Sequence, residues 1–89
     1  MPKRAVKIKN KLGLHARAAS QIVSIANKYA SEVTISKNDI TANGKSVLGI
    51  LTLTACLGTE LVLDVNGPDA EELLESLASL FEGKFGEAN

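Results

Sequence analysis

The residue with the clearest chemical potential is His15, the only histidine in the 89-residue chain. It follows a glycine-containing loop at residues 11–14 and precedes an alanine-rich stretch that begins at Ala16. If that stretch is a helix, its first amides are unpaired and carry partial positive charge, so they attract a phosphate and disfavour an imidazolium. A neutral imidazole nitrogen at this place is a nucleophile beside an anion site.

Two neighbours of His15 suit the same chemistry. Arg17 supplies a guanidinium that can contact the oxygens of a phosphoryl group on the ring, and Gly13 lets the backbone approach closely. The alternative is a lone surface histidine that acts at most as a helix cap. The spacing by itself leaves both interpretations open.

Other kinds of site find little support in the sequence. A single histidine with one distant cysteine, Cys56, cannot supply the three or four ligands of a zinc site, so we expect no metal and no cofactor. A hydrolase elbow of the type Gly-x-Ser-x-Gly does not occur in the sequence. We expect Cys56 to be a small buried hydrophobic residue, because no second cysteine could form a disulfide with it.

Length and composition limit the class of protein. With 89 residues, 45% of them apolar, the chain favours one domain over residues 1–89. The longest mostly apolar stretch, residues 47–57, is shorter than the roughly 20 residues that span a bilayer, so we expect no membrane insertion. The basic start has no signal-peptide core, and the single cysteine suits a reducing compartment, so we expect a cytoplasmic protein.

The charges are distributed unevenly although the net charge is zero. Residues 1–45 hold nine Lys and Arg against two Asp and Glu, whereas residues 46–89 hold one against eight. Such a dipolar molecule can steer an acidic partner to its basic region, although a well-solvated acidic helix explains the pattern equally well. Only three aromatic residues are present, which argues against nucleic-acid binding.

Hydrophobic periodicity predicts seven elements that would position these residues. They are a strand over 5–9, a helix over 16–28, a strand hairpin over 32–36 and 40–42, a short helix after Ser46 that ends before Gly58, a strand over 60–66, and a helix from Asp69 to Gly83. Asp69 and Glu72 resemble a capping box at the start of the last helix, and residues 83–89 form a polar tail. The order predicts an α+β fold with one sheet and all three helices on one face.

Two segments carry a resemblance to a known family. The run from Asn10 to Ala19, with Gly-Leu-His-Ala-Arg at its centre, and the run from Gly44 to Leu51 closely resemble the histidine-containing phosphocarrier (HPr) family of the bacterial phosphoenolpyruvate-dependent phosphotransferase system. The similarity covers nearly the whole chain, including its length and the order of its elements.

The resemblance implies a phosphocarrier rather than an enzyme. His15 would accept a phosphoryl group on Nδ1 from phosphorylated enzyme I and pass it to enzyme IIA of a sugar transporter, while Arg17 would stabilise the group. The family fold is an open-faced β-sandwich, βαββαβα, with a four-stranded antiparallel sheet of order 1-4-2-3 and three helices on one face. A carrier that presents one loop to several partners is expected to be a monomer.

One position departs from the family pattern. Ala18 stands where the family usually has proline directly after the arginine. Alanine is the best helix former, so we expect the helix to begin normally and the anion site to gain an N–H. The substitution bears on transfer rate and choice of partner rather than on the presence of the site.

Ser46 matches a second family feature, a serine that HPr kinase/phosphorylase modifies in many bacteria. A phosphate at a helix start is locally favourable, but it adds negative charge to a surface that must meet an acidic partner. A plain helix cap explains the serine equally well. The functional alternative is a regulatory binding module that acts through phosphorylated Ser46.

A docking surface is expected around the histidine. Its candidates are Leu14, Ala16, Val47, Leu48 and Leu51. Periodicity over two turns cannot separate core residues from contact residues, and Leu14 could also serve as a hydrophobic staple for the first helix.

Two segments of the sequence point to different branches of the phosphotransferase system. Residues 10–13 resemble nitrogen-branch carriers (NPr), whereas residues 44–49 resemble sugar-branch members that are regulated on serine.

Overall fold

The computed structural model describes residues 2–87. Its elements follow the predicted order, with one additional short 3₁₀ helix. They are β1 (Lys3–Lys7), α1 (Ala16–Ala26), β2 (Glu32–Lys37), β3 (Ile40–Asn43), α2 (Val47–Leu51), β4 (Glu60–Asn66), α3 (Ala70–Glu82) and η1 (Lys84–Gly86).

The four strands form one antiparallel sheet in the order β1-β4-β2-β3. The central strand β4 pairs with β1 on one side, where Ala5 lies opposite Val62, and with β2 on the other, where Ile35 lies opposite Leu63. Sequence order and spatial order differ because two helices connect strands that are not adjacent in the sheet. Helix α1 connects β1 to β2, and α2 connects β3 to β4. The sheet confirms the predicted fold class and strand order.

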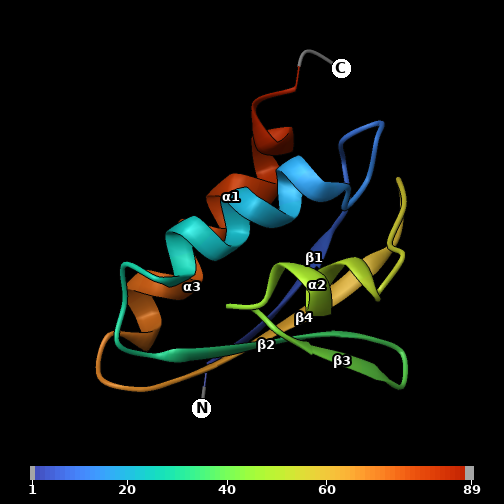
Figure 1. The fold of residues 1–89 in the computed structure, drawn as a ribbon. Helices are drawn as coiled ribbons and strands as arrows, with labels where there is room; N and C mark the ends of the chain where they lie inside the picture. Colours follow the sequence, from blue (N-terminus) through green and yellow to red (C-terminus); the bar gives the residue numbers. More distant parts are fainter. Residues whose placement is uncertain (1, 88–89) are drawn as a thin grey trace.

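Alternation along the central strands makes the two faces of the sheet different. On β2 and β4 the side chains of Val33, Ile35, Leu61, Leu63 and Val65 are buried, while the residues between them point to the other face. Helices α1 and α3 lie side by side across the sheet (Figure 1). The buried face is therefore the floor of the hydrophobic core, and the opposite face stays open.

Helix α1 can approach its neighbours closely because its buried residues are small. Ala18, Ala19 and Ala26 are fully buried together with Ile22, and the same helix contacts both α2 and α3. Ala18, the departure from the family pattern, thus lies in the first turn of a regular helix. This packing fixes the N-terminus of α1 at one edge of the molecule.

The start of α3 differs from the predicted capping box. Asp69 occupies the N-cap, but its carboxylate makes no cap hydrogen bond within its own helix. It accepts hydrogen bonds from the backbone N–H groups of Ala30 and Ser31 and from the Ser31 hydroxyl instead. The long-range partner wins because Ser31 is fully buried and its polar groups need an acceptor.

The chain after α3 was expected to be a polar tail, and the structure differs there. Lys84 and Phe85 both have φ of 56°, in the left-handed region, and this turn folds Phe85 back against Phe81. Phe85 is 2% exposed and belongs to the core. Burial of an aromatic ring thus outweighs the backbone cost and directs the chain toward the start of α1. Residues 88–89 of the predicted tail lie outside the described residues.

Among residues 2–87, no helix is both long enough and apolar enough to cross a membrane.

Candidate functional site

The loop before α1 is held tightly against the segment that follows α2. Gly13 has φ of +68°, and a Cβ at this position would lie 2.5 Å from the carbonyl oxygen of Ala55 and 2.9 Å from Cα of Cys56. The next amide, that of Leu14, donates to the same Ala55 oxygen at 2.9 Å. The glycine is therefore required both by its conformation and by the close approach of two backbones.

His15 is the N-cap residue of α1, with φ −83° and ψ 178°. Its Nδ1 accepts a hydrogen bond from the Arg17 backbone N–H at 3.3 Å, a long contact, and its carbonyl accepts from Ala19 at 2.9 Å. The ring is 28% exposed. Nδ1 therefore faces the free amides at the helix start, where an anion is favoured.

The second ring nitrogen of His15 faces a carboxylate. Nε2 lies 2.6 Å from Oε2 of Glu87, the last residue that the structure describes. Because Nδ1 accepts from an amide and Nε2 faces an acceptor, we assign the neutral ring with its proton on Nε2. That tautomer leaves the lone pair of Nδ1 available as a nucleophile.

Asn10 completes this arrangement. It is fully buried, and its side-chain amide donates to the Gly13 carbonyl at 2.8 Å and to Glu87 Oε2 at 3.1 Å. The hydrogen bond with His15, supported by Asn10, lowers the pKa of the Glu87 carboxyl. Glu87 is therefore ionised beside the ring at neutral pH.

Sequence reasoning missed both Glu87 and Asn10 as site residues. Glu87 lies 72 positions from His15 and falls in a stretch that reads as polar tail, so no local pattern connects the two. The one available signal was Phe85, because a lone aromatic residue in a polar segment marks a point where the chain can return to the core.

Arg17 lies in the first turn of α1, and its side chain is exposed. Among residues 2–87, no acidic side chain forms an ion pair with its guanidinium. The first turn of α1 also has no acidic residue. Within the described residues, the Arg17 guanidinium and the first turn of α1 thus have no acidic partner, and the Glu87 carboxylate lies at the Nε2 side of the His15 ring.

Ser46 caps the second helix. Its Oγ accepts from the backbone N–H of Gly49 at 3.0 Å, and the residue is half-buried. The predicted cap is thus confirmed.

The predicted docking residues separate into two groups. Leu48 is 77% exposed, Ala16 is exposed, and Val47 and Leu51 are half-buried against the core. Leu14 is only 5% exposed, so its side chain packs inside and the staple interpretation fits it. A partner cannot reach Leu14 without a rearrangement of the loop.

Two exposed leucines beside the site escaped prediction. Leu12 in the loop before His15 is 67% exposed, and Leu57, after α2, is 56% exposed. Leu12 and Leu57 lie in loops, outside any hydrophobic repeat, so a local sequence pattern does not predict whether they are exposed. With Leu48 they give three large apolar side chains on the loops and the helix around the site.

Cys56 was expected to be buried, and that expectation was wrong. The residue is exposed in the loop before β4, where its backbone N–H donates to Thr59 Oγ1 at 3.2 Å. Its thiol contacts Thr59 Oγ1 at 3.8 Å, and its backbone packs against Gly13.

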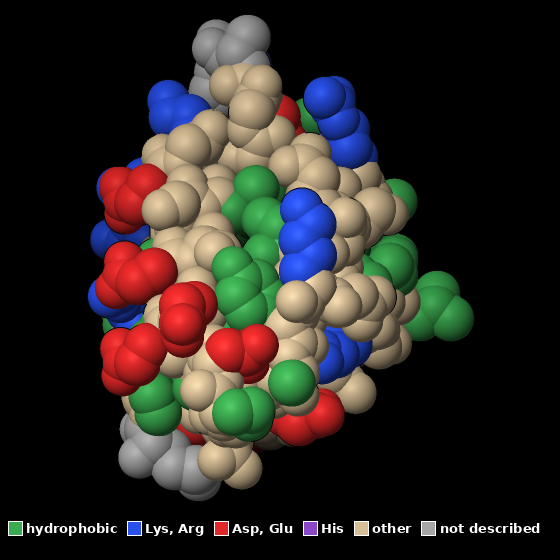
Figure 2. All heavy atoms as spheres, turned by 90° about the vertical axis from the view of Figure 1, so that its left-hand side faces the viewer, with side chains coloured by type: hydrophobic (Ala, Val, Ile, Leu, Met, Phe, Trp, Pro, Cys, Tyr) green, Lys and Arg blue, Asp and Glu red, His purple; other side chains and the backbone are tan. Residues whose placement is uncertain are grey.

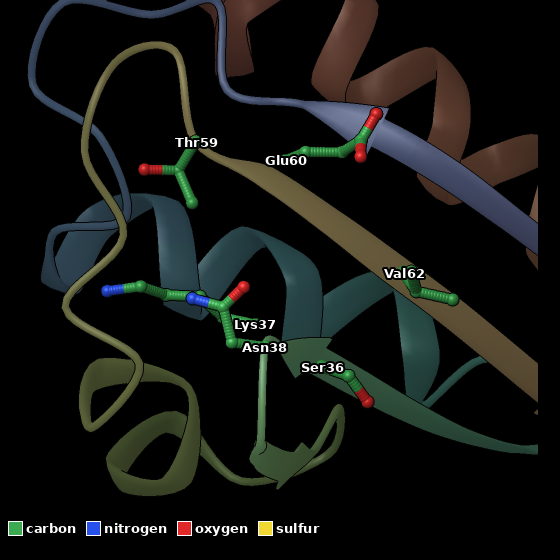
Figure 3. Close-up of a pocket in the computed structure, with 6 residues that line it drawn as sticks. All are labelled: Ser36, Lys37, Asn38, Thr59, Glu60 and Val62. Atoms are coloured by element: carbon green, nitrogen blue, oxygen red, sulfur yellow. The ribbon is translucent and has the colours of Figure 1, made fainter.

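A hollow of about 500 Å³ opens elsewhere, at the ends of β2 and β4. It is lined by Ser36, Lys37, Asn38, Thr59, Glu60 and Val62, and Figure 3 shows these side chains splayed apart rather than directed at one point. The Lys37 ammonium is already bonded to the Leu53 carbonyl at 3.0 Å. The hollow lacks the convergent polar groups of a ligand site.

The side of the molecule on the left of Figure 1 has a different character. Figure 2 shows acidic side chains gathered beside a band of hydrophobic ones, with no histidine visible on this face. Helix α3 contributes exposed Glu71, Glu72 and Glu75. Among the residues that the structure covers, no group of three His, Cys, Asp or Glu is placed to hold a metal ion.

Comparison with known proteins places the chain in a family. A family model described as the PTS HPr component phosphorylation site matches residues 2–83. The phosphocarrier protein HPr of Neisseria meningitidis serogroup A is 44% identical over 87 residues, which cover 98% of both chains. The phosphocarrier protein NPr of Shewanella violacea is 41% identical over 97% of this chain and 94% of its own.

Solved structures show the same architecture. HPr-C-His from Thermoanaerobacter tengcongensis superposes with a TM-score of 0.95 at 39% identity, covering 100% of both chains. An HPr dimer from the same organism superposes with a TM-score of 0.78 at 40% identity, covering 98% of this chain and 100% of the other.

Proposed function

The chain belongs to the HPr family and is a phosphocarrier of the phosphotransferase system, and from this membership we propose that Nδ1 of His15 carries the phosphoryl group. The group would come from phosphorylated enzyme I and go to enzyme IIA. The protein is thus a transfer protein rather than an enzyme, since its partners supply the catalysis. The cytoplasm, where these partners act, is the proposed location.

One observation carries the proposal. Nδ1 of His15 faces the free amides at the start of α1, with the Arg17 N–H at 3.3 Å. A phosphoryl group on Nδ1 would place its oxygens near these amides, and the Arg17 guanidinium, which has no ion pair among residues 2–87, would bind them too. The same geometry serves both transfers, because the developing charge lies on the same oxygens in each direction.

The surface around His15 suits docking. The side chains of Leu12, Leu48 and Leu57 are exposed. Ala16 and Arg17, at the start of α1, are exposed as well. We propose that Leu12, Ala16, Leu48 and Leu57 contact the partners, with Val47 and Leu51 supporting them from the half-buried side of α2. Basic residues in the first half of the chain would attract acidic partner surfaces.

Ser46 is proposed as a regulatory site. Its Oγ already accepts from Gly49, so a phosphate there would meet the amides at the start of α2. The added charge lies two residues from the proposed contact residue Leu48, and it would weaken association with an acidic partner. HPr kinase/phosphorylase is the proposed modifying enzyme. The alternative function, a regulatory binding module, would use the phosphorylated Ser46 surface as its main site.

The sugar branch is our proposal for the physiological role, with the nitrogen branch as the alternative. The resemblance of residues 44–49 to sugar-branch members favours the sugar branch, while the likeness to the NPr of Shewanella violacea favours the other. Competition between enzyme IIA proteins of the two branches for the phosphorylated carrier distinguishes them. We also propose a monomer, which sedimentation of the purified chain would test against the dimeric arrangement known for one relative.

Incubation with phosphoenolpyruvate and enzyme I tests the proposed function. The wild-type chain should acquire one acid-labile, alkali-stable phosphoryl group, and His15→Ala should acquire none while it remains folded. An acid-stable adduct, or equal labelling of His15→Ala, would contradict the proposal. Ser46→Ala serves as the matched control, because it removes the other proposed phosphorylation site and should leave this labelling intact.

A further inference from the structure

Both ring nitrogens of His15 have a hydrogen-bond partner, Arg17 N–H at Nδ1 and the Glu87 carboxylate at Nε2. The Glu87 side chain is 11% exposed, and its Oε2 lies 2.6 Å from Nε2. The chain brings this carboxylate to the ring from a segment that the proposed function does not otherwise use. A mostly buried carboxylate on the far nitrogen of a reactive imidazole calls for an explanation.

The position of Glu87 is fixed by packing. Phe85 is buried against Phe81, with ring centroids 5.0 Å apart, and Lys84 and Phe85 hold left-handed backbone conformations. The backbone N–H of Glu87 donates to the Lys84 carbonyl at 3.0 Å. In Figure 1 the C-terminal segment passes beside the start of α1. Glu87 therefore reaches His15 from an anchored turn.

Asn10 directs the carboxylate further. Its amide nitrogen donates to both Gly13 and Glu87, while its Oδ1 is buried without a hydrogen-bond partner among the described residues. The reverse orientation would place Oδ1 against a carbonyl and a carboxylate, both acceptors, so the observed one is required. A buried amide thus leaves one acceptor unpaired in order to bind Glu87 and the site loop.

We propose that Glu87 is a positioning residue that holds a proton on Nε2 of His15 throughout phosphoryl transfer. This inference rests on the proposed function of His15. It assigns the carboxylate a role in the chemistry of the ring, beyond that of an anchor for the end of the chain.

The transfer step balances with this proton in place. The Nδ1 lone pair forms a bond to phosphorus as the bond from phosphorus to the donor breaks, and that bond's electron pair leaves with the donor. The ring, now substituted on Nδ1 and protonated on Nε2, is a cation, and the Glu87 carboxylate balances its charge. On delivery the Nδ1–P bond breaks, its electron pair returns to Nδ1, and the neutral ring keeps its Nε2 proton.

Removal of the carboxylate should therefore affect both directions. Without Glu87 the cationic phosphorylated ring would release its Nε2 proton more easily, and the ring would then have to leave as an anion. Acceptance also slows, because the charge that develops on the ring is no longer balanced. Loss of the carboxylate that orients a metal-bound histidine typically costs about 10-fold or more in activity, and we expect an effect of about that size for His15.

Glu87→Gln tests the proposal, because it keeps the shape and removes the charge. Glu82→Gln is the matched control: its carboxylate is exposed, ion-pairs with Lys9 at 2.7 Å, and lies on α3 close to the same turn. The readouts are the exchange-protected Nε2–H signal in ¹H–¹⁵N spectra of the unphosphorylated protein, and the rates of phosphoryl acceptance from enzyme I and delivery to enzyme IIA. Glu87→Ala, with its thermal unfolding compared with that of wild type, repeats the test without a side-chain amide.

The expected result is a protected Nε2–H signal in wild type and Glu82→Gln, its loss in both Glu87 variants, and transfer about 10-fold slower in both directions. An unchanged signal, or rates within about twofold of those of Glu82→Gln, overturns the inference. If wild type accepts phosphoryl groups and the Glu87 variants do so equally well, the inference alone fails. If wild type accepts none, the proposed function fails as well.

Discussion

Helices α1 and α3 begin in opposite ways. The N-cap of α1 is a neutral imidazole, its first turn has no acidic residue, and Arg17 adds an exposed positive charge. The N-cap of α3 is Asp69, and Glu71 and Glu72 follow in its first turn. The α3 start thus has acidic residues of its own helix to compensate the dipole, whereas the α1 start has only the Glu87 carboxylate on the Nε2 side of the His15 ring, and its Nδ1 side is left for an external anion.

The two caps also differ in what their side chains hold. Both carboxylate oxygens of Asp69 accept hydrogen bonds from Ala30 and Ser31, so the side chain ties the loop before α3 to the loop before β2. The His15 side chain makes one long contact to its own helix, through Nδ1, and stays 28% exposed. The N-cap of α3 therefore stabilises the fold, whereas the N-cap of α1, on our proposal, binds the phosphoryl group.

The largest expected effect of breaking this difference comes from Arg17→Ala. Loss of the charged donor that we propose binds the transferred group should slow phosphoryl acceptance about 10²- to 10³-fold. Unfolding by urea should not change, because the guanidinium has no ion pair within residues 2–87. Lys28→Ala, which removes an exposed charge beyond the other end of α1, is the control. Equal slowing in both variants would point to net charge rather than to the site.

Gly13→Ala should destabilise the protein by about 3 kcal/mol, because it combines a left-handed conformation with a backbone clash. The clash is that of a Cβ placed 2.5 Å from the Ala55 oxygen. Gly58→Ala is the matched control, since Gly58 has φ of +90° and nothing within 4 Å of the added Cβ. Urea unfolding of the two variants separates the clash from the conformation. A similar midpoint for both would mean that the loop adapts freely.

Ser31→Ala sharpens the contrast from the α3 side. It removes the buried hydroxyl that bonds Asp69 and should cost about 2 kcal/mol of unfolding free energy. Phosphoryl acceptance at a temperature where the variant is folded should equal that of wild type. Ser20→Ala, an exposed position on α1, controls for loss of a hydroxyl. Slower acceptance in Ser31→Ala would show that the two helix starts are coupled.

The smallest effect is on the pH dependence of stability. The hydrogen bond from the Ser31 hydroxyl, followed by that from the Ala30 N–H, lowers the pKa of Asp69 below its usual 3.8. The folded state thus favours the ionised carboxylate, so this contribution is complete above the unfolded pKa and is lost as pH falls through the lower folded pKa. The free energies of unfolding of wild type and Asp69→Asn, measured in urea between about pH 6 and pH 3, should become more alike as the pH falls. Parallel curves would contradict the assignment.

Much of the fold follows from local patterns. The period of two along residues 60–66 predicts β4 with the bounds that the structure shows, and the spacing of the leucines after Asp69 predicts α3 to within a residue at each end. Local periodicity suffices there because each side chain repeats the same choice between core and solvent.

The rest depends on contacts between distant residues. Asp69 reads as a local capping box, but its carboxylate is used by Ser31, 38 positions away. The Glu87 contact with His15 depends on burial of Phe85, which a polar neighbourhood conceals. Polar side chains have several partners of similar energy, so the partner chosen is decided by tertiary packing rather than by spacing.

The most direct test of the central claim is the site of phosphorylation within the ring. The protein, labelled with ¹⁵N and phosphorylated by phosphoenolpyruvate and enzyme I, should show ³¹P–¹⁵N coupling to Nδ1 of His15 while Nε2 keeps its proton. Coupling to Nε2, or phosphate found on Ser46 alone under these conditions, would contradict the account.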